Sequence, residues 1–152
     1  MKFSNPLIVT ADLALAKQFY QEVLGLSVVL DFGTNVTLDG GICLQTLDTW
    51  KDFIGTEDIT FYPHSSELYF VEEDFDGFLQ RLSQCEIQYV HPMKEHRWGQ
   101  RVVRFYDTDG HIIEVGESLA AVCRRFQAQD MTPEEIALRM DIPLPHVLEL
   151  LA

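Results

Sequence analysis

A single carboxylate interrupts the short apolar run of residues 112–115. Glu114 is flanked by Ile112, Ile113 and Val115, and the run follows the turn signal Asp-Thr-Asp-Gly at residues 107–110. A buried carboxylate without a partner is strongly destabilising, so an internal strand carries one only where something compensates its charge. Glu114 is therefore either a surface residue or part of a site.

The first half of the chain contains a counterpart of this position. When the two halves are aligned, Gln45 corresponds to Glu114 and Asn5 corresponds to Glu67. An internal repeat of this length indicates two similar modules within one fold.

Helix and strand signals predict the same order of elements in both halves. Each half has one helix that follows an aspartate N-cap candidate, Asp12 or Asp74, and Gly25 stands where the first helix should end. We expect the helices at residues 13–24 and 75–84. The expected strands are residues 5–10, 26–32, 35–38 and 42–46 in the first half, and 67–74, 87–92, 100–106 and 111–117 in the second.

The predicted fold class is therefore α+β, with two βαβββ modules. They occupy about residues 3–47 and 65–117 of a domain that spans residues 1–117. A helix covers one face of each sheet, so the other face must be buried by the partner module or must line a cavity. We predict a curled mixed sheet around a cup. The aromatic-rich linker at residues 48–64 shows no long regular pattern and would be either a loop or a lid.

Strand alternation places polar side chains on the cup face, because successive residues of a strand point to opposite faces. The residues expected beneath the helices are Ile8, Leu44, Leu68, Phe70, Ile113 and Val115. The residues expected on the cup face are Asn5, Leu7, Val9, Cys43, Gln45, Glu67, Tyr69, Val71, Ile112 and Glu114.

The paired modules resemble the vicinal oxygen chelate superfamily, which includes glyoxalase I, extradiol dioxygenases and bleomycin-resistance proteins. The resemblance covers about residues 3–117 and rests on the phrases DLALAKQFYQEVLGL and WGQRVVRFYDTDGHIIEVGE. Its most specific part is the closing pattern Asp-x-Asp-Gly-x-x-x-Glu. The resemblance implies two βαβββ units curled around a cup, in which the metalloenzymes of the superfamily hold a divalent ion.

The resemblance also implies that Asn5, Gln45, Glu67 and Glu114 stand at the four ligand positions of the family. Metal-binding members most often have histidine at the two first-strand positions, where this chain has Asn5 and Glu67. An all-oxygen set can bind Mg²⁺ or Mn²⁺, but it offers no imidazole to hold Ni²⁺ or Zn²⁺ firmly. We expect no metal cofactor. The alternative is Mg, Mn, Ni or Zn held by Gln45, Glu67 and Glu114.

Arg104 is the predicted partner of the two acids. Its neighbour Phe105 looks like a core residue, so alternation points the Arg104 side chain into the cup. We hypothesise that Arg104 pairs with Glu67 or Glu114, in the place that a metal holds in relatives.

Composition limits the classes of partner. The formal net charge of -13 argues against a nucleic-acid partner, because phosphate binding needs clustered Lys and Arg. No apolar run approaches the roughly 18 residues of a membrane helix, and Asp12 and Lys17 interrupt any signal-peptide pattern. The three cysteines are scattered and form no zinc or disulfide pattern. We expect a cytoplasmic protein with no membrane partner.

Residues 118–152 predict a helical extension. A helix is expected within residues 118–129, a second begins at the capping signal Thr-Pro-Glu-Glu of residues 132–135, and a third lies within 144–152. The spacing resembles the start of a helix-turn-helix unit, but the last helix carries no Lys or Arg to bind a phosphate backbone. We expect a cap on a sheet edge or a dimer contact.

The favoured function is a protein similar to the glyoxalase and bleomycin-resistance proteins, which binds a small molecule in the cup. The acids favour a cationic ligand, and we expect a homodimer. Glu67 and Glu114 are the candidate catalytic residues, and the candidate ligand-binding residues are Asn5, Leu7, Gln45, Tyr69, His96, Trp98 and Arg104.

Two alternatives stay open. One is a divalent-metal-dependent lyase, isomerase or epimerase of the glyoxalase I type, in which a carboxylate moves a proton. The other is a structural or regulatory scaffold built around the C-terminal helices. Whether the protein is an enzyme is not decided by the sequence.

Overall fold

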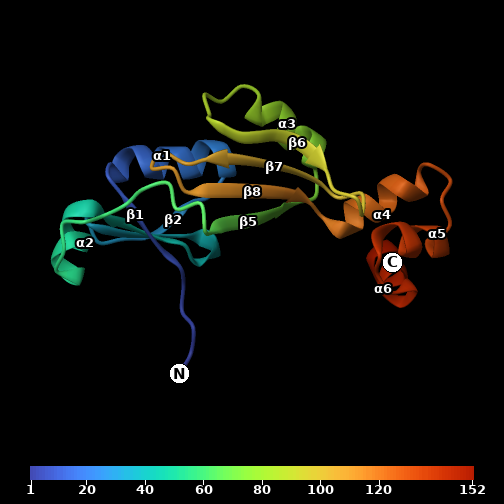
Figure 1. Ribbon diagram of the computed structural model, residues 1–152, viewed down its shortest axis with the longest axis horizontal. Helices are drawn as coiled ribbons and strands as arrows, with labels where there is room; N and C mark the ends of the chain where they lie inside the picture. The colour runs from blue at the N-terminus through green and yellow to red at the C-terminus, as the bar shows by residue number, and fades with distance from the viewer. The chain divides into compact units, whose positions relative to one another are not determined.

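The computed structural model describes residues 1–152, which form two compact units. The first unit comprises Met1–Ser66 and Tyr106–Ile112, and the second comprises Glu67–Phe105 and Ile113–Ala152. The order of elements confirms the predicted α+β class, with two βαβββ modules and a helical C-terminal extension (Figure 1). No helix has the length and apolar character needed to cross a membrane.

The first module is built on a four-stranded sheet with the order β1-β4-β3-β2. Its elements are β1 (Leu7–Thr10), α1 (Leu13–Leu24), β2 (Val28–Asp31), β3 (Asn35–Leu38), the 3-10 helix η1 (Asp39–Gly41), β4 (Cys43–Thr46) and α2 (Leu47–Ile54). β1 is parallel to β4, whereas β3 is antiparallel to β4 and to β2. The buried apolar residues of this module are Ala16, Tyr20, Val36, Leu38, Ile42, Cys43 and Leu44.

The predicted caps set the limits of α1. The Asp12 carboxylate accepts hydrogen bonds from the backbone N–H groups of Ala14 and Leu15, each at 3.0 Å. Gly25 ends the helix in the left-handed conformation, with φ of 71°. The same helix buries Tyr20, whose hydroxyl donates to Asp107 at 2.9 Å. This bond holds the turn of residues 106–112 within the first unit.

The helix α2 corrects the expectation of no long regular element in the linker. It spans Leu47–Ile54 and ends at Gly55, which adopts φ of 69°. Leu47, Trp50 and Ile54 have the spacing of one helix face, but the run is only two turns long and lacks a side-chain cap. The pattern was therefore too short to distinguish from a loop.

The second unit contains a sheet with the order β5-β8-β7-β6. Its elements are β5 (Glu67–Glu72), α3 (Phe75–Leu82), β6 (Tyr89–Glu95), β7 (Arg101–Tyr106), β8 (Ile112–Glu117), α4 (Leu119–Gln127), α5 (Pro133–Met140) and α6 (Leu144–Leu151). β6 begins two residues later than predicted, and it continues beyond Pro92 to Glu95 because proline is tolerated inside an edge strand. The expected helix-facing residues Ile113 and Val115 are buried.

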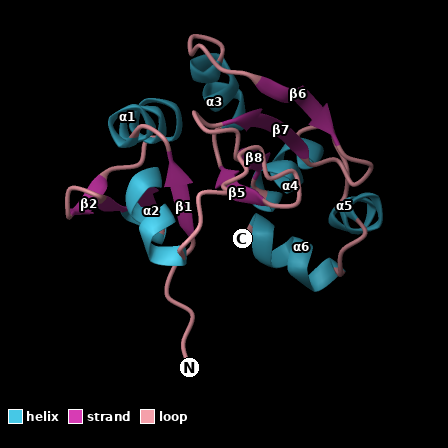
Figure 2. Ribbon diagram, turned by 60° about the vertical axis from the view of Figure 1, so that its left-hand side comes forward, coloured by secondary structure: helices cyan, strands magenta, loops and turns pink.

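The three C-terminal helices α4, α5 and α6 are drawn in Figure 2. Their side chains share a small core of their own. Its buried members are Val122, Cys123, Phe126, Ile136, Met140 and Val147. Thr132 and Glu135 form the predicted capping box at the start of α5. Packing among α4, α5 and α6 therefore buries most of the apolar residues of this extension, whereas Leu138 and Leu148 stay exposed.

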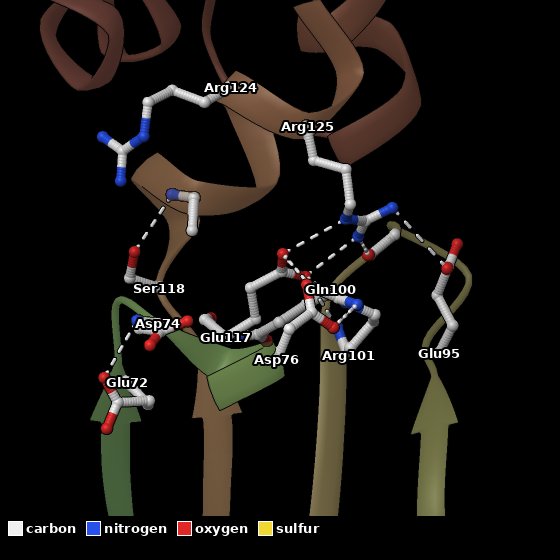
Figure 3. A network of polar contacts seen from close by, with 12 residues as sticks. Glu72, Asp74, Asp76, Glu95, Gln100, Arg101, Glu117, Ser118, Arg124 and Arg125 are labelled. Carbon is white, nitrogen blue, oxygen red and sulfur yellow. Dashed lines mark hydrogen bonds and ion pairs between the residues drawn. The ribbon is translucent and has the colours of Figure 1, made fainter. Parts of the chain in front are cut away.

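A buried ion network joins α4 to the second module's sheet (Figure 3). Glu117, at the end of β8, is 1% exposed and accepts hydrogen bonds from two arginines. Arg101 donates to it at 2.9 and 3.1 Å, and Arg125 of α4 donates at 2.9 and 3.1 Å. Arg101 also binds Asp76 of α3 at 2.7 Å. Burial opposes ionisation, but the two arginines outweigh it and hold the pKa of Glu117 below its ordinary value.

The substitution Glu117→Gln is expected to lower the free energy of unfolding by about 3–5 kcal/mol, because it leaves two arginines around a buried neutral amide. Urea denaturation measures this loss. The matched control is Glu57→Gln, which removes an exposed pair with Lys51 away from α4 and should change stability by about 0–1 kcal/mol. Equal effects of the two substitutions would show that the Glu117 network does not anchor α4.

Candidate functional site

Three strands of the second module bring two carboxylates and one arginine together. Arg104 of β7 donates from Nε to Glu67 Oε2 at 2.8 Å and from Nη2 to Glu67 Oε1 at 3.4 Å. Nη2 of the same guanidinium also donates to Glu114 Oε2. The predicted pairing of Arg104 is confirmed, and it involves both acids and not only one.

Alternation along the strands explains why these side chains meet. Val103 and Phe105 are fully buried on the helix-facing side of β7, so Arg104 points to the opposite face. Glu114 likewise lies between Ile113 and Val115 and faces away from their side. His91, which pairs with Arg104 in the β6–β7 register, places its Nε2 atom 3.3 Å from Arg104 Nη1. The cluster of Glu67, Glu114, Arg104 and His91 is called the arginine cluster below.

The two carboxylates of the arginine cluster differ in acidity. Burial raises the pKa of Glu114 to about 7, and the neighbouring Glu67 adds to this effect more than Arg104 offsets it. The hydrogen bond from Arg104 holds the pKa of Glu67 below its ordinary value. Near neutral pH, Glu67 is therefore ionised, whereas Glu114 is partly protonated.

A chain of side-chain hydrogen bonds links the predicted aromatic residues. The Trp98 indole Nε1 donates to Gln100 Oε1 at 3.2 Å, and Gln100 Nε2 donates to the Tyr69 hydroxyl at 3.0 Å. The His96 ring stacks on Trp98, with the ring centroids 4.2 Å apart. Burial, together with the charges of Arg104 and His91, lowers the pKa of His96. Neutral His96 thus extends the Trp98 surface.

The predicted residues of the first module have different surroundings. Gln45 is buried, and its amide is fully engaged: Asn35 donates to its Oε1 at 2.8 Å, and its Nε2 donates to the Thr34 carbonyl at 2.9 Å and to Thr49. Asn5 Nδ2 donates to Cys43 Sγ at 3.0 Å. The side chain of Leu7 is exposed.

The known proteins with similar sequence and structure agree with this architecture. The family model of the glyoxalase-like domain matches residues 3–120. The chain belongs to the glyoxalase-like family of the vicinal oxygen chelate superfamily. A search of curated proteins found no match.

Several solved structures resemble this glyoxalase-like chain. A protein of unknown function from Agrobacterium tumefaciens has 36% identity and a TM-score of 0.71, with 78% of this chain and 95% of that chain covered. A lactoylglutathione lyase from the same organism has 24% identity and a TM-score of 0.58, with coverage of 77% and 93%. A glyoxalase-related enzyme from Fulvimarina pelagi has 22% identity and a TM-score of 0.61, with coverage of 74% and 86%. The last two show a shared fold.

The residues at the four ligand positions of this glyoxalase-like protein do not fit a divalent metal ion. Both carboxylates bind the Arg104 guanidinium, and the Gln45 amide is saturated by hydrogen bonds within its own module. No imidazole stands at any of the four positions. No group of three or more His, Cys, Asp or Glu side chains in the structure has metal-binding geometry. A metal ion could bind both carboxylates only if the Arg104 guanidinium moved away from them.

Two residues of the site were not among the candidates from sequence. His91 contacts Arg104, and Gln100 orients both Tyr69 and Trp98. Gln100 could have been predicted, because strand alternation places it on the same face as Arg104. His91 could not, because its position opposite Arg104 depends on two register shifts between β6 and β7.

The raised pKa of Glu114 predicts a specific dependence of stability on pH. The folded protein binds this proton more tightly than the unfolded chain, whose carboxyl has an ordinary pKa of 4.5. The stabilisation is fully present below that value and is lost as the pH rises through about 7. Between these limits, the wild-type free energy of unfolding should therefore fall relative to that of Glu114→Gln. Urea titrations of both proteins across this range test it, and a constant difference would contradict the raised pKa.

Proposed function

We propose that the protein binds a small organic cation at the arginine cluster and uses no metal cofactor. The observation that carries this proposal is the bridging of Glu67 and Glu114 by Arg104. The Arg104 guanidinium occupies the space between the two acids, where a metal ion would have to bind. A ligand can still approach Glu67 from its exposed side.

Charge and exposure around the arginine cluster favour a cationic ligand. With Glu114 ionised, the two acids exceed the single arginine by one charge, and the whole chain carries a formal charge of -13. The Glu67 side chain is 36% exposed and hence reachable. Tyr69 and Val71 follow it on the same face of β5, at 51% and 60% exposure. An exposed tyrosine ring can hold an ammonium group by a cation–π contact.

A charge-matched set of probes tests the cation proposal. Benzyltrimethylammonium, benzyl alcohol and benzoate share a ring and differ in charge, and their binding can be followed by amide chemical shifts of β5 and β8. The cation should bind most tightly. Its affinity should increase from pH 6 to pH 8, as Glu114 loses its proton at a pKa of about 7.

Two variants distinguish cation binding at the arginine cluster from nonspecific attraction by the net negative charge of the protein. Glu67→Gln should remove the preference for the cation. Glu73→Gln, which removes an exposed acid paired with Arg124, should leave the preference unchanged. Tighter binding of benzoate than of the cation would overturn the proposal, because it would identify Arg104 as an anion site.

The absence of a metal cofactor is a separate expectation. Protein purified without chelators should contain no stoichiometric Mg, Mn, Ni or Zn, and added Mn²⁺ or Zn²⁺ should not raise its Tm.

The variant Arg104→Ala leaves two carboxylates and His91 around the space of the missing guanidinium, so Mn²⁺ or Zn²⁺ should stabilise this variant. A metal ion at 100 times its Kd adds about 2.7 kcal/mol to the free energy of unfolding. Arg124→Ala is the control, since it frees only exposed Glu73. Stoichiometric metal in the wild type would favour the metal-dependent alternative.

A second candidate function is an isomerase or epimerase of the glyoxalase type. The observation in its favour is the pKa of Glu114, which is raised to about 7 and suits proton transfer near neutral pH. Incorporation of deuterium from D₂O into the α-carbon of hydroxyacetone, present in the wild type and lost in Glu114→Gln, would support it.

We also expect a homodimer. The edge strand β2 exposes a run of apolar side chains, namely Val28, Val29, Leu30 and the following Phe32. A second copy of the chain would cover such an edge. Light scattering after gel filtration distinguishes a dimer from a monomer.

A further inference from the structure

We propose that a second site binds a zwitterion of amino-acid size between the turn of residues 96–99 and α5. A cavity of about 340 Å³ lies there, and its lining residues are Arg97, Trp98, Arg139, Met140 and Asp141. This volume falls at the lower end of the roughly 300–1,000 Å³ range of ligand pockets. The proposal does not depend on the function assigned to the arginine cluster.

The turn that carries Arg97 and Trp98 is fixed in place. Gly99 N–H donates to the His96 carbonyl at 2.8 Å, which makes Arg97 and Trp98 the two central residues of a β-turn. Gly99 has φ of 90°, and a Cβ atom there would stand 2.2 Å from the Phe126 ring. The turn therefore lies directly against α4. The stacking on His96 and the hydrogen bond to Gln100 fix the plane of the Trp98 indole.

Two lining residues carry charges that have no partner within the protein. Arg97 is the only arginine of the chain without an ion pair; the paired arginines are Arg81, Arg101, Arg104, Arg124, Arg125 and Arg139. The Asp141 carboxylate also makes no hydrogen bond or ion pair. Arg139 is different, because Glu95 lies 3.4 Å from it. Arg97 and Asp141 thus face one cavity without binding each other.

An arginine and a carboxylate that are both unpaired match the two charges of a free amino acid. A guanidinium binds a carboxylate in a bidentate manner, and an aspartate accepts hydrogen bonds from an ammonium group. A simple anion would meet repulsion from Asp141, and a simple cation would meet Arg97 and Arg139. Trp98 and Met140 supply adaptable apolar surface for a side chain. The chemistry therefore favours an α-amino acid with an apolar or aromatic side chain.

The cavity depends on the C-terminal extension. Arg139, Met140 and Asp141 lie at the end of α5, whereas the glyoxalase-like match ends at residue 120. The extension thus adds lining residues to a turn that belongs to the shared fold. Gln100 links the two sites, because it contacts both Trp98 and the Tyr69 hydroxyl at 3.0 Å.

Trp98 fluorescence tests this site directly. The chain has two tryptophans, so Trp50→Phe leaves Trp98 as the single reporter. In this background, L-phenylalanine should bind at least about tenfold more tightly than phenethylamine or 3-phenylpropionate, which each carry one of its two charges. Arg97→Gln should reduce the L-phenylalanine affinity to that of phenethylamine. Asp141→Asn should reduce it to that of 3-phenylpropionate.

Matched controls address charge and backbone effects. Lys94→Gln removes an exposed cation of β6 outside the cavity, and Asp130→Asn alters another aspartate with positive φ, 63° against 58° for Asp141. Both controls should bind like the parent. Equal affinities for the three probes, no fluorescence change up to about 10 mM L-phenylalanine, or loss of binding in Glu67→Gln but not in Arg97→Gln would each overturn the proposal.

Discussion

Two buried glutamates on β8 impose the constraint on which the second unit depends. Glu114 and Glu117 stand three residues apart, are 6% and 1% exposed, and face opposite sides of the sheet. The neighbouring strand β7 supplies an arginine for each, Arg104 for Glu114 and Arg101 for Glu117. Since an unpaired buried carboxylate is strongly destabilising, the two glutamates of β8 can be buried only because β7 supplies the two arginines.

The Glu117–Arg101 and Glu114–Arg104 pairs differ in the third residue that joins each of them. Glu117 has two arginines, which lower its pKa and join α3, β7 and α4 into one network. Glu114 shares one arginine with Glu67, so burial and the neighbouring carboxylate together raise its pKa. An excess of cations gives a structural anchor. An excess of acids leaves Glu114 with a proton that titrates near neutral pH.

Much of this arrangement could be predicted from sequence, since it rests on local rules. The caps at Asp12, Asp74 and Thr132, the alternation of β8 and the pairing of Arg104 all follow from spacing. What could not be predicted depends on tertiary structure. His91 reaches Arg104 only through shifts in the β6–β7 register, and Trp98 and Asp141 share a cavity only after α4 and α5 fold back. The short helix α2 gave too few turns for its period to be recognised.

In this glyoxalase-like fold, Arg104 lies between two carboxylates on neighbouring strands, and we propose that it takes the place of a metal ion. The most direct test is a carbon-13 NMR titration of the glutamate side-chain carboxyls, with Glu114 and Glu67 assigned by substitution to glutamine. We expect Glu114 to titrate near pH 7 and Glu67 to have a pKa below its ordinary value. If both carboxyls titrate at the ordinary value of 4.5, Arg104 does not bridge a buried acid pair, and the central claim is wrong.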